Sequence, residues 1–481
     1  MCHTLIFTKQ ILMSKTKQLI EQLQIRSGGG EIRAGNQVRL LHDSCENFPE
    51  WLDVLAKAER FILIEMYIFA DDAFGRKILD LLVEKARAGV YVALVYDWVG
   101  SIGASLKNVF RPLREAGGLA VPYNPLGFAR GIGLISRNHR KSIIIDGHTA
   151  FVSGLCISAA WEGNPAKNAA AWRDTGLLLR GAAVADLISA FADTLQSQGR
   201  ALPEHITADT AAVSGSVRAG IVATTPNNNN MMRVDLNAIA LAERRLWLTD
   251  AYFMPTRLYT QALINAAADG VDVRILVPQT SDIAWIARVS RTRYRELLHA
   301  GVRVFEWNGT MIHAKSAVAD GRWARIGSTN LNFASWHFNR ELDVVLEDTE
   351  LAEQLEVQFL RDLDNATEIV LNDEERAVAA ERRKLGFSQL KIRSRQQAQA
   401  VARQFLRLSH AFEGNFYGEK IVDEKEAYAY LGLGAMLLAA GLLLWFFPKL
   451  LVVPVILLLV LGGASTVWSA WRQIRGFRGK K

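Results

Sequence analysis

Two stretches of one pattern, HRKSIIIDG at residues 139–147 and HAKSAVADG at residues 313–321, stand out in the chain. Each reads His-x-Lys-x-x-x-x-Asp and has a short, largely apolar run before an Asp-Gly dipeptide. Asp-Gly after such a run, with apolar residues following, is typical of a strand that enters a hairpin turn. The repetition predicts that one structural unit occurs twice.

Each stretch supplies three candidate catalytic residues: His139, Lys141 and Asp146 in the first, and His313, Lys315 and Asp320 in the second. The histidine and the lysine are two residues apart, and on a strand such residues share a face. We therefore expect them to project together from one strand end. The aspartate falls at the turn, which favours a structural hydrogen-bonding role over a role as acid or base.

Polar and acidic residues follow both stretches. After the second come Gly327-Ser328-Thr329-Asn330 and, further on, Glu341; after the first come Ser153-Gly154-Leu155-Cys156 and then Asp174. Asn330, Asp174 and Glu341 complete the set of candidate site residues.

A second repeat lies upstream of each stretch. The segments 58–64 (AERFILI) and 242–248 (AERRLWL) both read as a helix end that leads into a buried strand. Amphipathic helical patterns at 75–89 and 256–270 follow, and then apolar strands at 90–96 and 271–277. This alternation indicates βαβ units and an α/β fold class. The polar run 226–230 separates the two halves.

Composition limits the class of protein and its partners. The chain has 481 residues, of which 50% are hydrophobic and 22% are charged, which excludes a disordered or collagen-like chain. Its formal charge of +7 favours an anionic partner, and leaves nucleic acid and acidic lipid both open. The three cysteines form no disulfide framework and no CxxC metal spacing. A reducing compartment fits this cysteine usage best.

Two uncharged runs near the C-terminus, 428–447 and 450–471, each reach the length that spans a bilayer. Only Pro448-Lys449 separates them, so they predict a transmembrane helical hairpin, with a buried helical pair in a soluble core as the alternative. The tail 472–481 is basic and has no acidic residue, which places it and the catalytic part in the cytoplasm. The basic, partly apolar residues upstream resemble a helix that lies on an anionic membrane. No signal peptide is seen at the N-terminus, so no export is expected.

These patterns divide the chain into six expected segments: an N-terminal segment (1–34), a first domain (35–205), a second domain (206–372), a basic amphipathic helical segment (373–427), two transmembrane helices (428–471) and a basic cytoplasmic tail (472–481).

The doubled His-x-Lys-x-x-x-x-Asp pattern, with its trailing Gly-Ser-x-Asn and acidic residue, resembles the phospholipase D superfamily. Within it, the run 62–101 and the segments 137–141 and 172–175 are similar to bacterial cardiolipin synthases of the B type. The likeness covers residues 35–348. It implies two phospholipase D-like α/β sandwich domains with one active site at their interface. Cys156 departs from the family pattern, which usually has asparagine there, so the first half lacks that amide donor.

The resemblance implies that one histidine attacks a phosphodiester and the other acts as general acid. His139 is favoured as nucleophile, and the reverse assignment stays open. Lys141, Lys315 and Asn330 would hold the non-bridging oxygens, while Asp174 and Glu341 would each orient a histidine. Such chemistry requires no cofactor and no metal.

The expected function is transfer of a phosphatidyl group, through a phosphohistidine, from a donor phospholipid to phosphatidylglycerol. Either phosphatidylglycerol or phosphatidylethanolamine would be the donor, and the partner is the anionic surface of a bacterial inner membrane, with the catalytic domains facing the cytoplasm. One alternative is a phospholipase D hydrolase, phosphodiesterase or nuclease. We expect no nucleic acid partner, because the predicted hairpin argues against a nuclease. The other alternative is a membrane-anchored scaffold with a decayed site.

Overall fold

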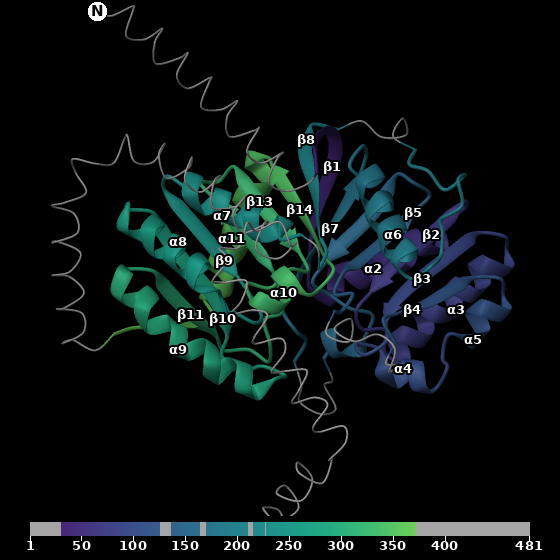
Figure 1. Ribbon diagram of the computed structural model, residues 1–481, viewed down its shortest axis with the longest axis horizontal. Coiled ribbons are helices and arrows are strands. Elements are labelled where there is room, and N and C mark those ends of the chain that lie inside the picture. Colours follow the sequence, from purple (N-terminus) through teal and green to yellow (C-terminus); the bar gives the residue numbers. More distant parts are fainter. Residues whose placement is uncertain (1–29, 126–135, 164–169, 210–214, 227, 372–481) are drawn as a thin grey trace, which may run out of the picture. The chain divides into compact units, whose positions relative to one another are not determined.

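The computed structural model describes residues 30–125, 136–163, 170–209, 215–226 and 228–371 (Figure 1). All of them belong to one compact unit. The predicted amphipathic segment 373–427, the hairpin 428–471 and the tail 472–481 lie outside the described residues. Among the helices that are described, none has the length and apolar character needed to cross a bilayer.

The described residues form a mixed α/β fold around one sheet of 15 strands. The first half contributes β1 (Ile32–His42), β2 (Phe61–Met66), β3 (Tyr91–Asp97), β4 (Leu119–Tyr123), β5 (Lys141–Ile145), β6 (Thr149–Ser153) and β7 (Thr175–Arg180). The second half contributes β8 (Val217–Thr224), β9 (Arg245–Thr249), β10 (Asp272–Pro278), β11 (Arg303–Trp307), β12 (Ser316–Ala319), β13 (Trp323–Gly327), β14 (Glu341–Glu347) and β15 (Ala366–Ile369). β1 starts inside the predicted N-terminal segment 1–34, and the boundary between 205 and 206 stays a prediction.

The two halves have the same strand order, as the internal repeat indicated. The order is β1-β7-β6-β5-β2-β3-β4 in one half and β8-β14-β13-β12-β9-β10-β11 in the other, with β15 added at the far edge. β1 pairs antiparallel with β8 and so joins the halves in the middle of the sheet (Figure 1). The two Asp-Gly hairpins are confirmed: β5 pairs antiparallel with β6, and β12 with β13.

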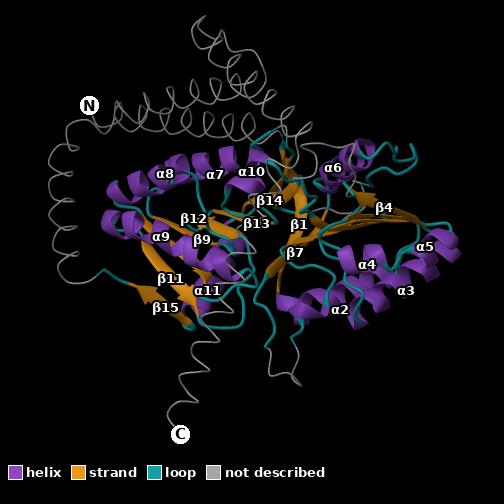
Figure 2. Cartoon of the chain, turned by 60° about the horizontal axis from the view of Figure 1, so that its bottom comes forward, coloured by secondary structure: helices purple, strands orange, loops and turns teal. Residues whose placement is uncertain are grey.

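Helices cover both faces of the sheet (Figure 2). The first half has α2 (Asp43–Ala56), α3 (Ala73–Arg87), α4 (Ile102–Leu106), α5 (Arg111–Glu115), a 3-10 turn (Ala159–Trp161) and α6 (Val184–Ser197). The second has α7 (Asn230–Leu241), α8 (Arg257–Ala268), α9 (Ala284–Ala300), α10 (Phe333–His337) and α11 (Thr349–Leu363). β2 and β3 are parallel, as are β9 and β10, which confirms the predicted βαβ units.

Residues that alternate along β2 enter two separate cores. Phe61 and Leu63 pack in the core that also contains residues of α6 and α11, whereas Ile62 and Ile64 pack with α2 and α3. A strand that is buried on both faces needs the continuous apolar sequence seen at 61–64. Because the first of these cores includes residues of both halves, packing as well as strand pairing joins them.

Candidate active site

The sheet topology places both His-x-Lys pairs at the same kind of edge. β5 runs antiparallel to β2, and Lys141 pairs with Met66, the last residue of β2. β12 runs antiparallel to β9, and Ser316 pairs with Thr249, the last residue of β9. Each histidine therefore lies beside the carboxyl ends of the parallel strands of its half, where α/β proteins commonly bind ligands.

Two short backbone bridges connect these edges across the halves. Asn138 bridges Arg340, and Arg173 bridges Ile312. The N–H of His139 donates to the carbonyl of Arg340 (2.9 Å), and the N–H of His313 donates to the carbonyl of Arg173 (2.7 Å). In both bridges, the residue that precedes a histidine meets the residue that precedes a carboxylate of the other half.

The bridges bring each histidine onto a carboxylate from the opposite half. Nδ1 of His139 lies 2.8 Å from Oε2 of Glu341, and Nδ1 of His313 lies 2.9 Å from Oδ2 of Asp174. All four side chains are buried. We assign the Nδ1–H tautomer to both rings, because an ionised carboxylate accepts a proton there and leaves the Nε2 lone pair available.

A second donor holds each carboxylate. The hydroxyl of Ser328 donates to Oε2 of Glu341 (2.6 Å), and the indole N–H of Trp161 donates to Oδ2 of Asp174 (2.9 Å). In the first half, a Cβ added to Gly154 would stand 2.1 Å from Asp174 Oδ1. A glycine is therefore required against the aspartate, and the corresponding position of the second half holds the serine that binds Glu341.

The two lysines are buried beside the histidines. Nζ of Lys141 donates to the carbonyl of His139 (2.6 Å) and lies 5.2 Å from the centre of the Tyr67 ring. Nζ of Lys315 bonds to the carbonyl of His313 and lies 2.9 Å from its Nε2. The described residues show this lysine–imidazole contact in the second half alone, so the two copies differ at the nitrogen that would react.

Burial sets the protonation of these groups. Desolvation lowers the pKa of His139 below its usual value, and it lowers the pKa of His313, with the help of Lys315, to about 4. Desolvation also lowers the pKa of Lys141, and that of Lys315 to about 8. Both imidazoles are thus neutral at pH 7, and a neutral imidazole is the form that attacks phosphorus.

The two carboxylates stay ionised. Burial alone would raise the pKa of Glu341, but attraction to His139 and the hydrogen bonds that it accepts hold this pKa below its usual value. The same balance, set mainly by His313, lowers the pKa of Asp174. Each histidine therefore faces a fixed negative charge, which stabilises any positive charge that develops on the ring.

Two tyrosines, which sequence reasoning did not select, pack on the histidines. The ring centres of Tyr67 and His139 are 4.8 Å apart, and those of Tyr252 and His313 are 5.9 Å apart, both in edge-on geometry. The sequence did contain a signal for them, because each tyrosine follows one of the two repeated strand segments. Ser328 lay in the polar turn that the sequence singled out, whereas Trp161 had no sequence signal.

Asn330 and Cys156, which occupy equivalent positions in the two halves, differ in their chemical character. Asn330 is buried, and its side-chain oxygen has no hydrogen-bond partner among the described residues. Cys156 is fully buried, and desolvation raises the pKa of its thiol. A buried, protonated thiol fits a small residue that fills space better than it fits a nucleophile.

The two motif aspartates are held away from the histidines, at the other ends of β5 and β12. Asp146 accepts from the N–H groups of Glu59, Arg60 and Phe61 (2.8–3.0 Å). Asp320 accepts in the same way from the three N–H groups at residues 243–245 (2.8–3.0 Å). Both have positive φ (54° and 55°) at the hairpin turn. Their contacts fit the structural role that the turn position favoured.

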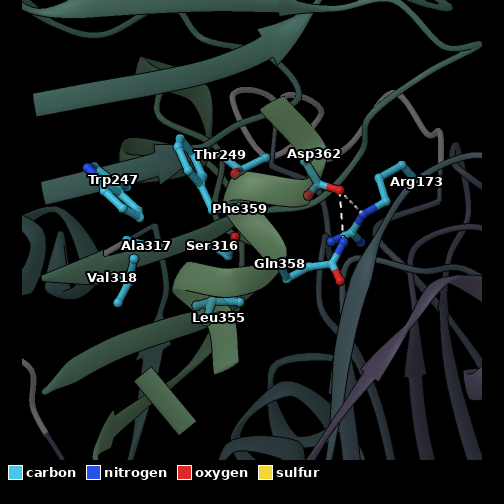
Figure 3. A pocket seen from close by; sticks show the side chains of 10 residues that line it. All are labelled: Arg173, Trp247, Thr249, Ser316, Ala317, Val318, Leu355, Gln358, Phe359 and Asp362. Atoms are coloured by element: carbon cyan, nitrogen blue, oxygen red, sulfur yellow. Dashed lines mark hydrogen bonds and ion pairs between the residues drawn. The ribbon is translucent and has the colours of Figure 1, made fainter. Parts of the chain in front are cut away.

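A small pocket lies between α11 and the strands β9 and β12 (Figure 3). It is partly open to solvent, and none of the candidate catalytic residues lines it. Arg173, at its edge, donates to Oδ1 of Asp362 (2.9 Å), as Figure 3 shows. Arg340 makes the equivalent bond to Asp193 of α6. Each arginine precedes a site carboxylate and ties it to a helix of the other half.

The described residues contain no group of three or more His, Cys, Asp or Glu side chains arranged to hold a metal ion. The site brings together two imidazoles, two ammonium groups and two carboxylates. In a water-poor setting, such fixed charges can stabilise a phosphoryl group during displacement.

Comparison with known proteins gives a consistent family. Residues 236–363 match the family model described as "Cardiolipin synthase, PLD-like domain". Cardiolipin synthase 2 of Bacillus anthracis is 36% identical over 363 residues, which are 74% of this chain and 70% of that protein. Cardiolipin synthase of Geobacillus sp. (strain WCH70) is 34% identical over 367 residues, or 75% and 73% of the two chains.

Among solved structures, the phosphatidylserine synthase of Haemophilus influenzae Rd KW20 is similar in fold. It has a TM-score of 0.59 at 16% sequence identity, and the match covers 81% of this chain and 98% of that one. At this identity the likeness concerns the fold alone.

Proposed function

The chain belongs to the cardiolipin synthase family and is a phosphatidyltransferase of the phospholipase D type; from this premise we propose that one site at the junction of its two halves transfers a phosphatidyl group to phosphatidylglycerol. The acceptor is the free hydroxyl of phosphatidylglycerol, and the donor is phosphatidylglycerol or phosphatidylethanolamine. The product is cardiolipin, with glycerol or ethanolamine released.

The first step forms a phosphohistidine. Nε2 of His139 attacks the donor phosphorus, a P–N bond forms, and the P–O bond to the headgroup alcohol breaks. His313 gives its Nε2 proton to the departing oxygen. The bound phosphodiester carries a negative charge, which favours the protonated form of this otherwise neutral ring. Lys141, Lys315 and Asn330 contact the non-bridging oxygens as negative charge builds on them.

The second step reverses the roles. His313 removes the proton from the hydroxyl of phosphatidylglycerol, the new P–O bond forms and the P–N bond breaks. His139 becomes a neutral imidazole again, and no proton is gained or lost over the cycle. Glu341 and Asp174 orient the rings throughout, whereas Asp146 and Asp320 support the strands from which the histidines project.

The assignment of His139 as nucleophile is supported by the difference between the lysines. Nζ of Lys315 lies 2.9 Å from Nε2 of His313 and engages the lone pair that an attack on phosphorus would need, whereas Nε2 of His139 has no such contact among the described residues. Lys141 makes its bond to the carbonyl of His139. The observation that carries the whole proposal is the crossed pairing of each histidine with a carboxylate of the other half, because it makes one site from two motifs.

Product analysis tests the proposal. The purified chain is incubated with isotope-labelled phosphatidylglycerol and phosphatidylethanolamine, and lipids are resolved by mass spectrometry. Labelled cardiolipin supports a synthase, and the released alcohol identifies the donor; phosphatidic acid alone rejects synthesis in favour of hydrolysis. Cleavage of DNA or RNA in a gel assay would support the nuclease alternative. Unchanged lipid turnover after His139→Ala or His313→Ala would support the scaffold alternative.

Localisation is part of the same proposal. We place the enzyme on the inner membrane with its catalytic part in the cytoplasm, held by the predicted hairpin 428–471. The support is the sequence pattern: two uncharged runs, followed by the basic tail 472–481.

A further inference from the structure

Exposed apolar residues gather around the site edge of the sheet. The described residues include nine large apolar side chains that are well exposed, and six of them lie on segments that follow strand ends at the histidine edge. These six are Ile102, Leu106, Leu258, Ile283, Val289 and Phe333, here called the apolar rim. Leu106 is 71% exposed, the largest value among the nine.

The topology explains why these residues share an edge. α4 follows the carboxyl end of β3, while α8 and α9 follow the carboxyl ends of β9 and β10. α10 follows β13, whose last residues pair with the first residues of β12, next to Lys315. Figure 1 shows α4 and α9 along the lower part of the sheet, on either side of the junction between the halves.

Hydrogen bonds tie the rim to the tyrosines that pack on the histidines. The hydroxyl of Ser101, just before α4, donates to the carbonyl of Tyr67 (3.1 Å). The amide of Asn332, just before α10, donates to the carbonyl of Tyr252 (3.2 Å). The hydroxyl of Tyr252 donates to Oδ1 of Asp282, which precedes Ile283 (2.8 Å). These hydrogen bonds connect the segments that carry the rim to the two tyrosines that pack on the histidines.

The segments that carry the rim have more basic than acidic residues, although Lys107, Arg111 and Arg291 form ion pairs with Asp71, Glu115 and Glu306. The segment 101–115, which contains α4 and α5, has three basic residues and one acidic residue. α9 has four arginines and one glutamate. Apolar side chains with basic neighbours form the combination that enters the headgroup region of an anionic bilayer.

We propose that the apolar rim docks the catalytic part on the surface of an anionic phospholipid bilayer, so that lipid reaches the histidines without crossing water. The inference rests on the proposed function, because the substrate is a bilayer lipid. The six apolar side chains belong to four segments that follow strand ends at the histidine edge, and such a spread of apolar contacts suits a fluid lipid surface. The remaining excess of basic residues favours anionic lipid over neutral lipid.

A depth measurement tests this surface independently of catalysis. In the full chain, with Cys2 and Cys45 replaced by serine, Leu106→Cys is labelled with an environment-sensitive fluorophore. The matched control is Val357→Cys on α11, which is 48% exposed and follows β14 from the opposite edge of the sheet. The vesicles contain phosphatidylglycerol and phosphatidylethanolamine, with or without lipids brominated on the acyl chain.

The proposal predicts that emission from the Leu106 label shifts to the blue and is quenched by the brominated lipids, while the Val357 label does neither. Equal, water-like emission from both labels would overturn it, even if the enzyme makes cardiolipin. If neither protein makes cardiolipin but only the Leu106 label is quenched, the docking surface stands and the proposed function fails.

A kinetic experiment gives a second readout. We expect Leu106→Ser to lower kcat/KM about tenfold on vesicles, because one large apolar contact with lipid is lost. On a short-chain lipid dissolved below its micelle concentration, kcat/KM should stay unchanged. Equal loss on both substrates would mean that Leu106 supports the fold or the site, and would overturn its role in docking.

Discussion

Replacing Glu341 with glutamine removes the negative charge behind the proposed nucleophile and changes the side-chain volume little. During attack, Nε2 of His139 bonds to phosphorus and the ring gains positive charge. With Nδ1 and Oε2 2.8 Å apart, the centres of the two charges are separated by roughly 4 Å. At an effective dielectric constant of about 20, that attraction amounts to about 4 kcal/mol.

A loss of about 4 kcal/mol in transition-state stabilisation lowers kcat about 10³-fold. The assay is the initial rate of cardiolipin formation, measured by mass spectrometry on vesicles. Ser328→Ala is the matched control: it removes one donor to Glu341 but keeps the charge, and we expect a loss of about tenfold. If Glu341→Gln loses less than Ser328→Ala while both proteins keep their melting temperature, the electrostatic reasoning is wrong.

Three further predictions concern the motif aspartate, pH and the buried cysteine. Asp320→Asn should lower the free energy of unfolding by about 1–3 kcal/mol, because three backbone N–H groups lose a charged acceptor, and it should leave kcat nearly unchanged. Urea unfolding measures the first effect and initial rates measure the second. A 10³-fold loss of kcat with unchanged stability would show that Asp320 is catalytic. Because the pKa of His313 is lowered to about 4 in the folded chain, the stability due to its neutral form is complete above pH 6.5 and is lost as the pH falls from 6.5 to 4, by about 3 kcal/mol. Urea titrations at pH 7 and pH 5 should show a smaller pH dependence for His313→Asn than for the parent chain, and equal dependences would contradict the pKa shift. Cys156→Ala should keep kcat within about threefold, since the thiol is protonated and fills space; loss of activity together with loss of thiol-reagent sensitivity would instead identify a reactive cysteine.

The sequence alone predicted the two His-x-Lys pairs and the two repeated halves that carry them. His139 and Lys141 end up at one strand end because strand periodicity is a local property, and the Asp-Gly hairpins depend on a local backbone conformation. The parallel strand pairs followed from hydrophobic patterns that repeat along the chain. These features needed no knowledge of how the halves meet.

The pairing of each histidine with a carboxylate of the other half could not be predicted from the sequence. It depends on the central β1–β8 pair and on two single-residue bridges, and contacts of such long separation leave no periodic signal. Reasoning from the residues therefore named Asp174 and Glu341 as partners of histidines without saying which acid meets which ring. Trp161 was missed for a similar reason, since it lies in a short turn and acts through Asp174.

The covalent intermediate offers the most direct test of a shared site. The chain is mixed with labelled donor lipid, quenched at alkaline pH, where phosphohistidine survives, digested and sequenced by mass spectrometry. We expect a phosphatidyl group on His139 alone, absent from His139→Ala and formed more slowly in His313→Ala, which lacks the acid for the departing alcohol. Independent labelling of both histidines, with each surviving the loss of the other, would show that the two motifs work separately.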